Sequence, residues 1–306
     1  MATNIKVGHL KITDHLILGI TQDKLKKGEE KFSHCSIESK AYIGWNQISN
    51  ALKDGEIDAA FVLAPTAMDL ALSGVDIKLT LFAHKTGSVF VKNKAAGINS
   101  VKDLKGKIIV IPFQLSVHHM LLHQLLTEAG LTTGVGKDVT LEVMAPSQMP
   151  QAIEFDEDGE CAGYIVAEPF GTQAVNGGYA EEFYLSKDLW AKHPCCVVVM
   201  KNELIQNHPE AVQELINSLV DSGSIAQNQT ERAVAVGVEF LGQSKDVVTK
   251  VLTDPPDRVM FNELMPVVED LAKIQDYMCD KMKLLNGKVD LSKFVDTEFA
   301  KSAGAK

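Results

Sequence analysis

The sequence is poor in arginine, in positive charge and in long apolar runs, and each shortage excludes a class of protein. Only two of the 306 residues are arginines, and Lys+Arg 30 against Asp+Glu 40 gives a net charge of −10. This sign opposes binding through phosphate neutralisation, so no nucleic-acid partner is expected. No apolar run approaches the roughly 18 residues of a membrane span. An anion site here must rely on lysines, hydroxyls, imidazoles and backbone N–H groups rather than on arginine clusters.

Cysteine is also scarce. The cysteines are Cys35, Cys161, Cys195, Cys196 and Cys279. Five cysteines are too few for a disulfide framework. The protein is expected to be a monomer, in which an odd number of cysteines leaves at least one thiol free. No CxxC pair occurs, and Cys195 and Cys196 would point to opposite faces if they are neighbours on a strand. The thiols are therefore expected to be reduced and structural, with no metal and no cofactor.

What is present indicates an α/β protein. The content of 45% apolar and 23% charged residues is ordinary for a globular chain. Over the first two hundred residues, strand-like and helical patterns alternate, which favours α/β layering with mostly parallel sheets. After Asn202 the pattern becomes almost purely helical, starting with residues 209–220, where a proline opens a run of apolar residues at helical spacing.

Internal repetition is the most informative feature. Residues 54–65 (DGEIDAAFVLAP) have a second copy at residues 158–169 (DGECAGYIVAEP). Each copy ends in an apolar run that reads as a buried strand stopped by proline. A second pair of segments, residues 88–93 and 197–202, is rich in β-forming residues and ends in Lys-Asn both times. These repeats indicate two similar α/β lobes.

A further repeat lies at the front of each half. The strand-like residues 5–7 lead to Thr13-Asp14-His15, and residues 108–110 lead to Ser116-Val117-His118. In the second copy the continuation is a helix for which Ser116 is a natural N-cap. Both copies therefore read as a strand, a loop, a hydroxyl residue, one further residue and a histidine.

The repeats predict one lobe inserted into the other. Lobe 1 is expected over residues 1–90 and 197–306, including the helical C-terminal part, and lobe 2 over residues 91–196. The chain then crosses twice between the lobes, through extended segments near 88–93 and 195–202. Two crossings make a hinge, and a ligand cleft is expected between the lobes.

A set of short motifs carries a family resemblance. They are residues 54–60 (DGEIDAA), 100–107 (SVKDLKGK), 112–122 (PFQLSVHHMLL), 167–170 (AEPF), 208–212 (HPEAV) and 290–296 (DLSKFVD). In this order they resemble the nitrate/sulfonate/taurine class of substrate-binding proteins of ABC importers. The resemblance implies a type II periplasmic-binding-protein fold with two crossing hinge strands, a small-molecule solute in the cleft and an ABC permease as partner. It also implies a periplasmic location. The sequence as given shows no signal peptide, whether removed or never present, so a cytoplasmic location is the alternative expectation.

The candidate ligand-binding residues follow from the repeats. Strand ends and helix N-termini of both lobes would face one cleft, where unpaired backbone N–H groups suit small oxyanions. The predicted site comprises Thr13, Asp14, His15, Pro65 and Thr66 from lobe 1, Lys85, Thr86, Gly87 and Ser88 before the first crossing, and Phe113, Gln114, Ser116, Val117, His118, Glu168 and Phe170 from lobe 2. The segment 84–88 also resembles a ligand-contacting segment of the family.

Several of these residues have a structural alternative. Ser116 caps a helix whatever the function. The alternative for Lys85 is a surface lysine, and the alternative for Phe113 and Phe170 is a place in the hydrophobic core. Glu168 and Asp14 oppose an anion unless they anchor structural hydrogen bonds or meet an ammonium group. Nitrate, bicarbonate, sulfonates, taurine, pyrimidines and carboxylates all remain open as ligands.

The function expected is capture of a small polar or anionic solute by lobe closure, without catalysis. No nucleophile elbow, glycine-rich phosphate loop or HExxH motif occurs. One alternative is a cytosolic ligand sensor on the same fold. Another is an enzyme similar to those of the menaquinone or thiamin-pyrimidine pathways, with His118 and Glu168 or His15 and Asp14 as an acid/base pair.

Overall fold

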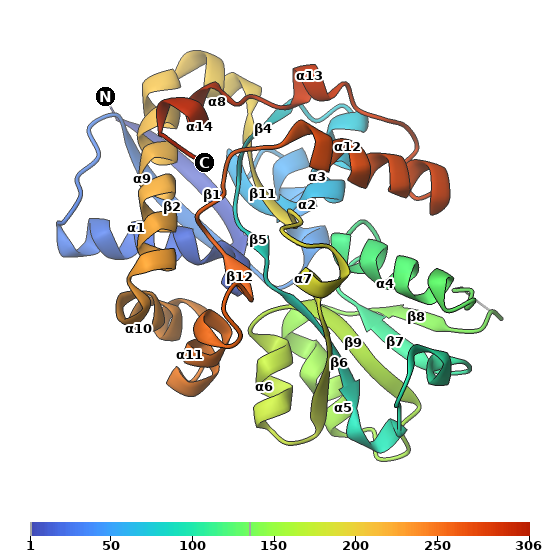
Figure 1. The fold of residues 1–306 in the computed structure, drawn as a ribbon. Helices are drawn as coiled ribbons and strands as arrows, with labels where there is room; N and C mark the ends of the chain where they lie inside the picture. The colour runs from blue at the N-terminus through green and yellow to red at the C-terminus, as the bar shows by residue number, and fades with distance from the viewer. Residues whose placement is uncertain (1, 135) are drawn as a thin grey trace.

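Two five-stranded sheets form the centres of two lobes in the computed structural model, which describes residues 2–134 and 136–306 (Figure 1). The first sheet has the order β2-β1-β3-β11-β4 and the second the order β10-β6-β9-β7-β8. The first contains β1 (Thr3–Leu10), β2 (Cys35–Tyr42), β3 (Ala59–Leu63), β4 (Ile77–Phe82) and β11 (Cys196–Lys201). The second contains β6 (Ser88–Asn93), β7 (Ile108–Ile111), β8 (Thr140–Val143), β9 (Cys161–Ala167) and β10 (Ala180–Leu185). The predicted α/β class and two-lobed architecture are confirmed.

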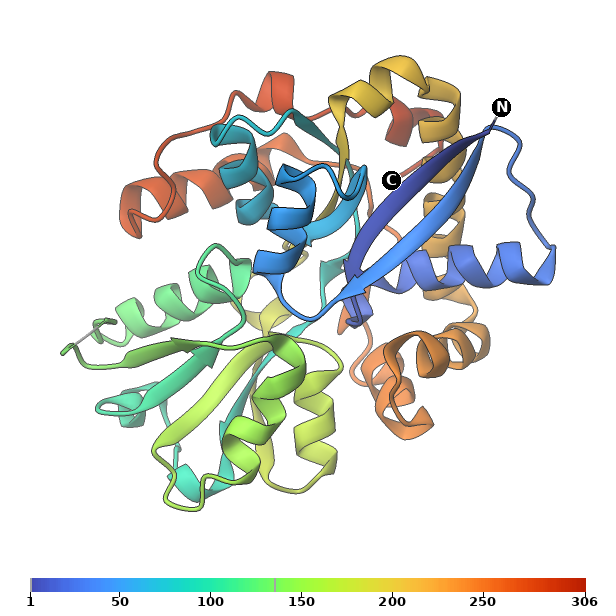
Figure 2. The same cartoon turned by 180° about the vertical axis from the view of Figure 1, so that it is seen from behind.

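Helices cover both sheets. The first lobe has the 3-10 turn η1 (Thr13–His15) and helices α1 (Leu16–Lys27), α2 (Trp45–Lys53) and α3 (Ala64–Leu72). The second has α4 (Val117–Glu128), α5 (Met149–Glu154), α6 (Phe170–Asn176) and α7 (Ser186–Leu189). The C-terminal part has α8 (Asn202–Asn207), α9 (Pro209–Asn228), α10 (Thr230–Leu241), α11 (Lys245–Thr253), α12 (Val268–Asp276), α13 (Leu291–Phe294) and α14 (Glu298–Ser302). Seen from behind, this part surrounds the first lobe, and α11 reaches α6 of the second (Figure 2).

One strand in each sheet runs against the other four. In the first sheet it is β11, antiparallel to β3 and β4, and in the second it is β6, antiparallel to β9 and β10. The remaining four strands of each sheet are parallel to one another, so each sheet is mixed, with a single strand opposing a mostly parallel set. Both β6 and β11 are entered directly after a crossing between the lobes. After each crossing the chain enters the next sheet at the edge that holds the carboxyl ends of the other strands. The strand that it forms there must therefore run antiparallel to them.

The crossings lie slightly earlier than the predicted segments. The first is made by residues 83–87 and the second by residues around 186–195, and Thr86 N donates to His193 O (2.9 Å), so the two lie side by side. The predicted division at residues 90/91 falls inside β6, and Cys196, expected in lobe 2, pairs with Leu63 in the first sheet.

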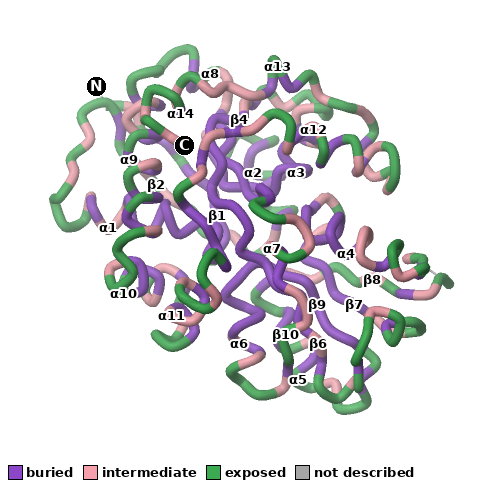
Figure 3. Tube along the Cα trace, viewed as in Figure 1, coloured by how far each residue is buried: buried purple, intermediate pink, exposed green. Residues whose placement is uncertain are grey.

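A short antiparallel ribbon holds the first crossing. Its strands are β5 (Lys85–Thr86) and β12 (Val259–Met260), so the crossing pairs with the C-terminal part of the chain. In Figure 3 the buried tube is continuous from the first sheet through this region to the second. The central strands explain that continuity, because every residue of β3 and of β9 is buried.

Candidate functional site

The carboxyl ends of the parallel strands from both lobes meet at one place. Thr13–His15 follows β1, Thr66 lies in the first turn of α3 after β3, and Glu168 follows β9. Hydrogen bonds join the walls directly: Thr13 N donates to Glu168 O (2.8 Å), and Thr66 Oγ1 donates to Leu115 O (2.8 Å). The two lobes are thus in contact, as in a closed binding protein.

The contact between the lobes is lined by buried polar groups. Those with at most 2% of their surface exposed include Thr13, Asp14, His15, Thr66, His84, Thr86, Ser88, Ser116, His118, Glu168, Thr172 and His193. Buried polar atoms are ordinarily hydrogen-bonded, and each exception requires an explanation. The exceptions among the described residues are seven atoms, Arg232 Nε in α10 and six others: Thr13 Oγ1, Asp14 Oδ1, His15 Nε2, Trp45 Nε1, His84 Nδ1 and His193 Nε2.

Short contacts connect the predicted residues to one another. Asp14 Oδ2 lies 3.0 Å from His84 Nε2. Glu168 N donates to Gly87 O (2.9 Å), and the neighbouring Ser88 Oγ lies 2.9 Å from His118 Nε2. Segments from both lobes and from the first crossing therefore form one network around the interface.

Glu168 is held by a structural ion pair. Its carboxylate accepts hydrogen bonds from Thr172 N (3.0 Å), Thr172 Oγ1 (2.8 Å) and Arg258 Nε (2.9 Å). Arg258 comes from the C-terminal part and is itself 3% exposed. This carboxylate is therefore neutralised within the protein, which answers the objection that it would repel an anion.

Other predicted residues have partners outside the interface. Lys85 Nζ lies 3.4 Å from Asp270 and 4.0 Å from Glu263, both in the C-terminal part. Thr86 Oγ1 donates to Lys85 O (2.6 Å), and Ser116 Oγ accepts from His119 N (3.0 Å) as the predicted N-cap of α4. Pro65, Gly87, Val117 and Phe170 are buried, Phe113 is half-buried and Gln114 is exposed. Their contact with a ligand stays a prediction.

Sequence reasoning did not place His193, Cys195, Cys196 or Trp45 in the site, and it included His84 only as the first residue of the segment 84–88. The expectation that Cys195 and Cys196 point apart is wrong: one ligand atom from each lies within 4.8 Å of the others in a cluster with Asp14 and His84. The reason is that β11 begins at Cys196, so Cys195 lies outside the regular pleat and the alternation of faces does not apply. The signal available in the sequence was the pair of adjacent cysteines, Cys195 and Cys196, at a predicted crossing segment.

Burial and neighbouring charges set the protonation of this region. Burial lowers the pKa of His15 well below its usual range and lowers the pKa of His193 to about 4, so both rings are neutral at pH 7. Burial also opposes a charge on His84, but the Asp14 carboxylate outweighs it and raises the pKa of that imidazole to about 10. The Asp14–His84 contact is consequently an ion pair.

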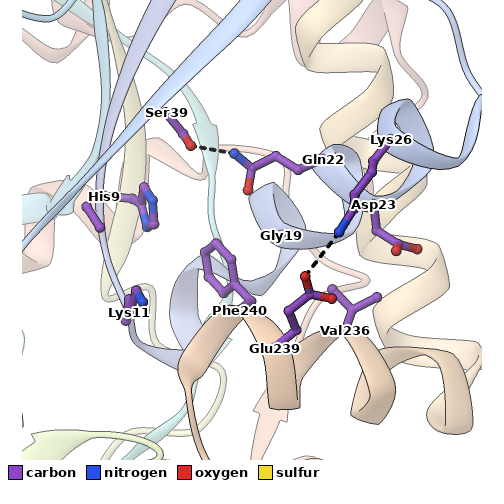
Figure 4. A pocket seen from close by; sticks show the side chains of 11 residues that line it. His9, Lys11, Gly19, Gln22, Asp23, Lys26, Ser39, Val236, Glu239 and Phe240 are labelled. Carbon is purple, nitrogen blue, oxygen red and sulfur yellow. Dashed lines mark hydrogen bonds and ion pairs between the residues drawn. The ribbon is translucent and has the colours of Figure 1, made fainter.

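Two pockets of the described structure do not include the polar centre of the interface. One of about 370 Å³ belongs wholly to the first lobe and its C-terminal helices, and Figure 4 shows His9, Gln22 and Phe240 among its lining residues. None of the predicted ligand-binding residues lines it. A smaller pocket of about 190 Å³ lies between the lobes, with Ile12 and Tyr42 on one side and Pro146 and Phe170 on the other.

Known proteins share this fold and sequence pattern. A ligand-binding component of an ABC-type import system from Staphylococcus aureus, solved with zinc bound, is 25% identical and has a TM-score of 0.87 over 98% of this chain and 99% of that one. The nitrate import ATP-binding protein NrtC of Synechococcus elongatus is 25% identical over 74% of this chain and 38% of its own length. The nitrate/nitrite binding protein NrtA of Nostoc sp. is 25% identical over 89% of this chain and 61% of its own length.

These relatives confirm the predicted family resemblance. They are named as binding and transport proteins, and the chain spans less than two thirds of the length of the two curated ones. Among the helices of residues 2–134 and 136–306, none has the length and apolar character needed to cross a membrane. The family model described as NMT1-like matches residues 2–238. This chain belongs to the NMT1-like family.

Proposed function

We propose that this protein is the solute-binding component of an ABC importer and captures a small polar or anionic solute between its two lobes. The observation that carries the proposal is the set of unpartnered buried polar atoms where the lobes meet, in a member of a family whose named relatives import or bind nitrate. A bound solute would supply the missing partners of these atoms, whose burial is otherwise costly.

The unpartnered atoms of Thr13, His15 and Trp45 suit an acceptor-rich solute. The indole Nε1 of Trp45 only donates, and the hydroxyl of Thr13 donates as well as accepts. His15 Nδ1 lies 3.0 Å from both Leu10 N and Leu10 O, and its Nε2 donates in the tautomer whose Nδ1 accepts from Leu10 N. The rings of His15 and Trp45 meet edge to face with centroids 5.9 Å apart. The two donors of Thr13 and Trp45, joined by His15 Nε2 in that tautomer, fit the oxygens of a nitrate, carboxylate, bicarbonate or sulfonate group.

Closure without chemistry is the proposed mechanism. A solute that contacts both walls stabilises only the closed form, so its binding raises the closed population. Moving that equilibrium from 1:99 to 99:1 takes about 5.5 kcal/mol of differential affinity. Two to four hydrogen bonds to a charged solute, at about 1.5–3 kcal/mol each, supply this amount. No catalytic step is part of the proposal.

The proposed partner is an ABC permease, which would receive the solute from the closed form, and the proposed location is extracytoplasmic. Both come from the family, because the named relatives are parts of import systems. A monomer is proposed as the binding unit, since both walls of the site come from one chain.

Trp45→Phe tests the proposal, since it removes one N–H donor and keeps a buried aromatic ring. Nitrate, bicarbonate, taurine, alkanesulfonates, pyrimidines and small carboxylates are screened by thermal shift, and the affinity of any binder is measured by calorimetry. One solute class is expected to raise Tm, and Trp45→Phe is expected to weaken its affinity by about 10- to 100-fold.

Trp190→Phe is the matched control: Trp190, the other tryptophan of the sequence, lies half-buried in the second crossing under Lys273 Nζ (3.8 Å from the ring centroid), and its N–H is not among the unpartnered buried atoms. It should bind the solute like the parent protein. No thermal shift with any solute, or equal affinities for the two variants, would remove the Trp45 region from the binding site.

A further inference from the structure

Four side chains that ligate metals in proteins converge at the base of the interface between the lobes. They are Asp14, His84, Cys195 and Cys196, which we call the crossing cluster. One ligand atom from each lies within 4.8 Å of all the others, and all four residues are fully buried. Asp14 comes from η1 and His84 from the first crossing, while Cys195 ends the second crossing and Cys196 begins β11. No continuous motif joins them; the fold brings them together.

The distances within the crossing cluster approach those of a metal site. Asp14 Oδ2 lies 3.0 Å from His84 Nε2 and 3.6 Å from Cys196 Sγ. In a tetrahedral zinc site, with bonds of roughly 2.0–2.3 Å, neighbouring ligand atoms are about 3.3–3.8 Å apart. The first pair is slightly closer than this range and the second lies within it, so an ion requires Asp14 and His84 to move apart by a few tenths of an ångström.

Two atoms of the crossing cluster lack a partner and face the same space. Asp14 Oδ1 and His84 Nδ1 are buried and make no hydrogen bond among the described residues. A β-carbon built on Gly87 would lie 3.0 Å from the first and 3.2 Å from the second. The glycine, at φ +90°, thus leaves open a position that both atoms border. Unpartnered ligand atoms beside an open position are the independent sign of a bound group.

The second lobe closes the cluster from the other side. Cys195 Sγ lies 3.9 Å from Nδ1 and 4.0 Å from Nε2 of His118, and His118 is fixed by its contact with Ser88 Oγ (2.9 Å). The sulfur of Cys195 therefore lies between the other members of the crossing cluster and the imidazole of His118 in the second lobe.

We propose that Asp14, His84, Cys195 and Cys196 bind one thiophilic divalent transition-metal ion, for which Zn²⁺ is the probe. Two sulfurs, one imidazole and one carboxylate suit Zn²⁺ or Co²⁺, whereas Mg²⁺ and Ca²⁺ require mostly oxygen ligands. Binding releases protons to solvent, because the ion replaces the proton of the His84–Asp14 ion pair and those of the thiols. The inference goes beyond the proposed function and does not rest on it, because the donors assigned to the solute are those of Thr13, His15 and Trp45.

An ion in the crossing cluster would join the two crossings. His84 directly precedes β5, and Cys195 directly precedes β11. One ion would therefore cross-link the two segments that form the hinge between the lobes. Binding to the folded form alone also raises Tm with increasing metal concentration. The expected physical effect is a stiffer hinge in the metal-bound protein.

Direct metal binding by the full-length, chelator-treated protein tests the inference. Zn²⁺ is titrated against a competing chromophoric chelator, and Co²⁺ is added separately for its absorption spectrum. One equivalent of each is expected to bind, with sulfur-to-cobalt charge-transfer absorption and the strong visible bands of tetrahedral Co²⁺. Mg²⁺ and Ca²⁺ should neither compete nor shift Tm.

Matched variants locate the site. Cys195→Ser and Cys196→Ser are expected to weaken Zn²⁺ binding by at least about 10-fold, since even changes behind the ligands cost 10- to 100-fold. Cys35→Ser and Cys161→Ser alter other buried free thiols and should leave affinity unchanged. Gly87→Ala should also weaken binding by filling the open position, whereas Gly97→Ala, at a similar φ with nothing within 4 Å, should not.

Two results would overturn the inference. One is a Co²⁺ complex of the unmodified protein without thiolate charge transfer, which requires no variant to fold. The other is Zn²⁺ affinity unchanged in both Cys195→Ser and Cys196→Ser. The solute screen is run on the metal-free protein and on the Zn²⁺-treated protein, so that solute binding and metal binding can each fail without the other.

Discussion

Replacing Arg258 with methionine is expected to lower the free energy of unfolding by about 3–5 kcal/mol, because it leaves the buried carboxylate of Glu168 without its cation. Arg258 NH2 lies 2.8 Å from Glu168 Oε1, and the two side chains are 2% and 0% exposed. Arg258 also pairs with Glu182 of the second lobe. The loss should therefore also weaken the closed arrangement and, with it, solute affinity.

The only other arginine provides the control. Arg232 pairs with Glu29 and Asp23 at the surface, where its side chain is 24% exposed, so Arg232→Met should cost at most about 1 kcal/mol. Urea unfolding of both variants gives the comparison. The double variant Arg258→Met/Glu168→Gln should recover part of the stability, since it removes the uncompensated charge. Similar losses for Arg258→Met and Arg232→Met would contradict a structural role for the buried pair.

Replacing Gly163 with alanine is expected to cost about 2–6 kcal/mol, from backbone strain and overpacking together. Gly163 lies in β9 with φ +152° and pairs with Lys92 of β6. A β-carbon there would lie 2.1 Å from the carbonyl oxygen of Val91 and 2.9 Å from the Cα of Lys92. Both are backbone atoms of the neighbouring strand, so the clash is relieved only by separating β6 from β9.

Gly97→Ala measures the backbone part of that cost alone. Gly97 also has a positive φ, +65°, but nothing lies within 4 Å of a β-carbon built on it. Its replacement should cost about 1–2 kcal/mol. If chemical denaturation gave the same loss for both variants, the close approach of β6 and β9 would not be a source of stability.

The repeats predicted the architecture because they mark buried strands. Residues 54–65 and 158–169 contain β3 and β9, both completely buried, and burial restricts sequence enough to leave a visible pattern. The predicted boundaries were displaced for the same reason. Residues 88–93 and 197–202 mark the reversed strands β6 and β11, whereas the first crossing itself covers only residues 83–87 and has no periodic pattern.

The candidate site was predictable where a local signal existed. Ser116 carries an N-cap pattern, and the structure has that hydrogen bond. The partners of Lys85 and Glu168 were not predictable, because Asp270 and Arg258 come from far along the chain and only tertiary packing brings them close. For the crossing cluster, the adjacent cysteines Cys195 and Cys196 were a visible signal in the sequence. The rule that neighbouring side chains of a strand point to opposite faces did not apply to them, because only Cys196 belongs to β11.

The β5–β12 ribbon ties the range of lobe movement to the last third of the chain. Thr86 pairs with Val259, the residue next to Arg258, so the first crossing cannot rotate without carrying this loop along. When the lobes part, Arg258 either follows the ribbon and leaves Glu168, or stays with Glu168 and strains the ribbon. The opening angle, and hence the size of molecule that can enter, is consequently governed by a segment that contributes none of the proposed solute contacts.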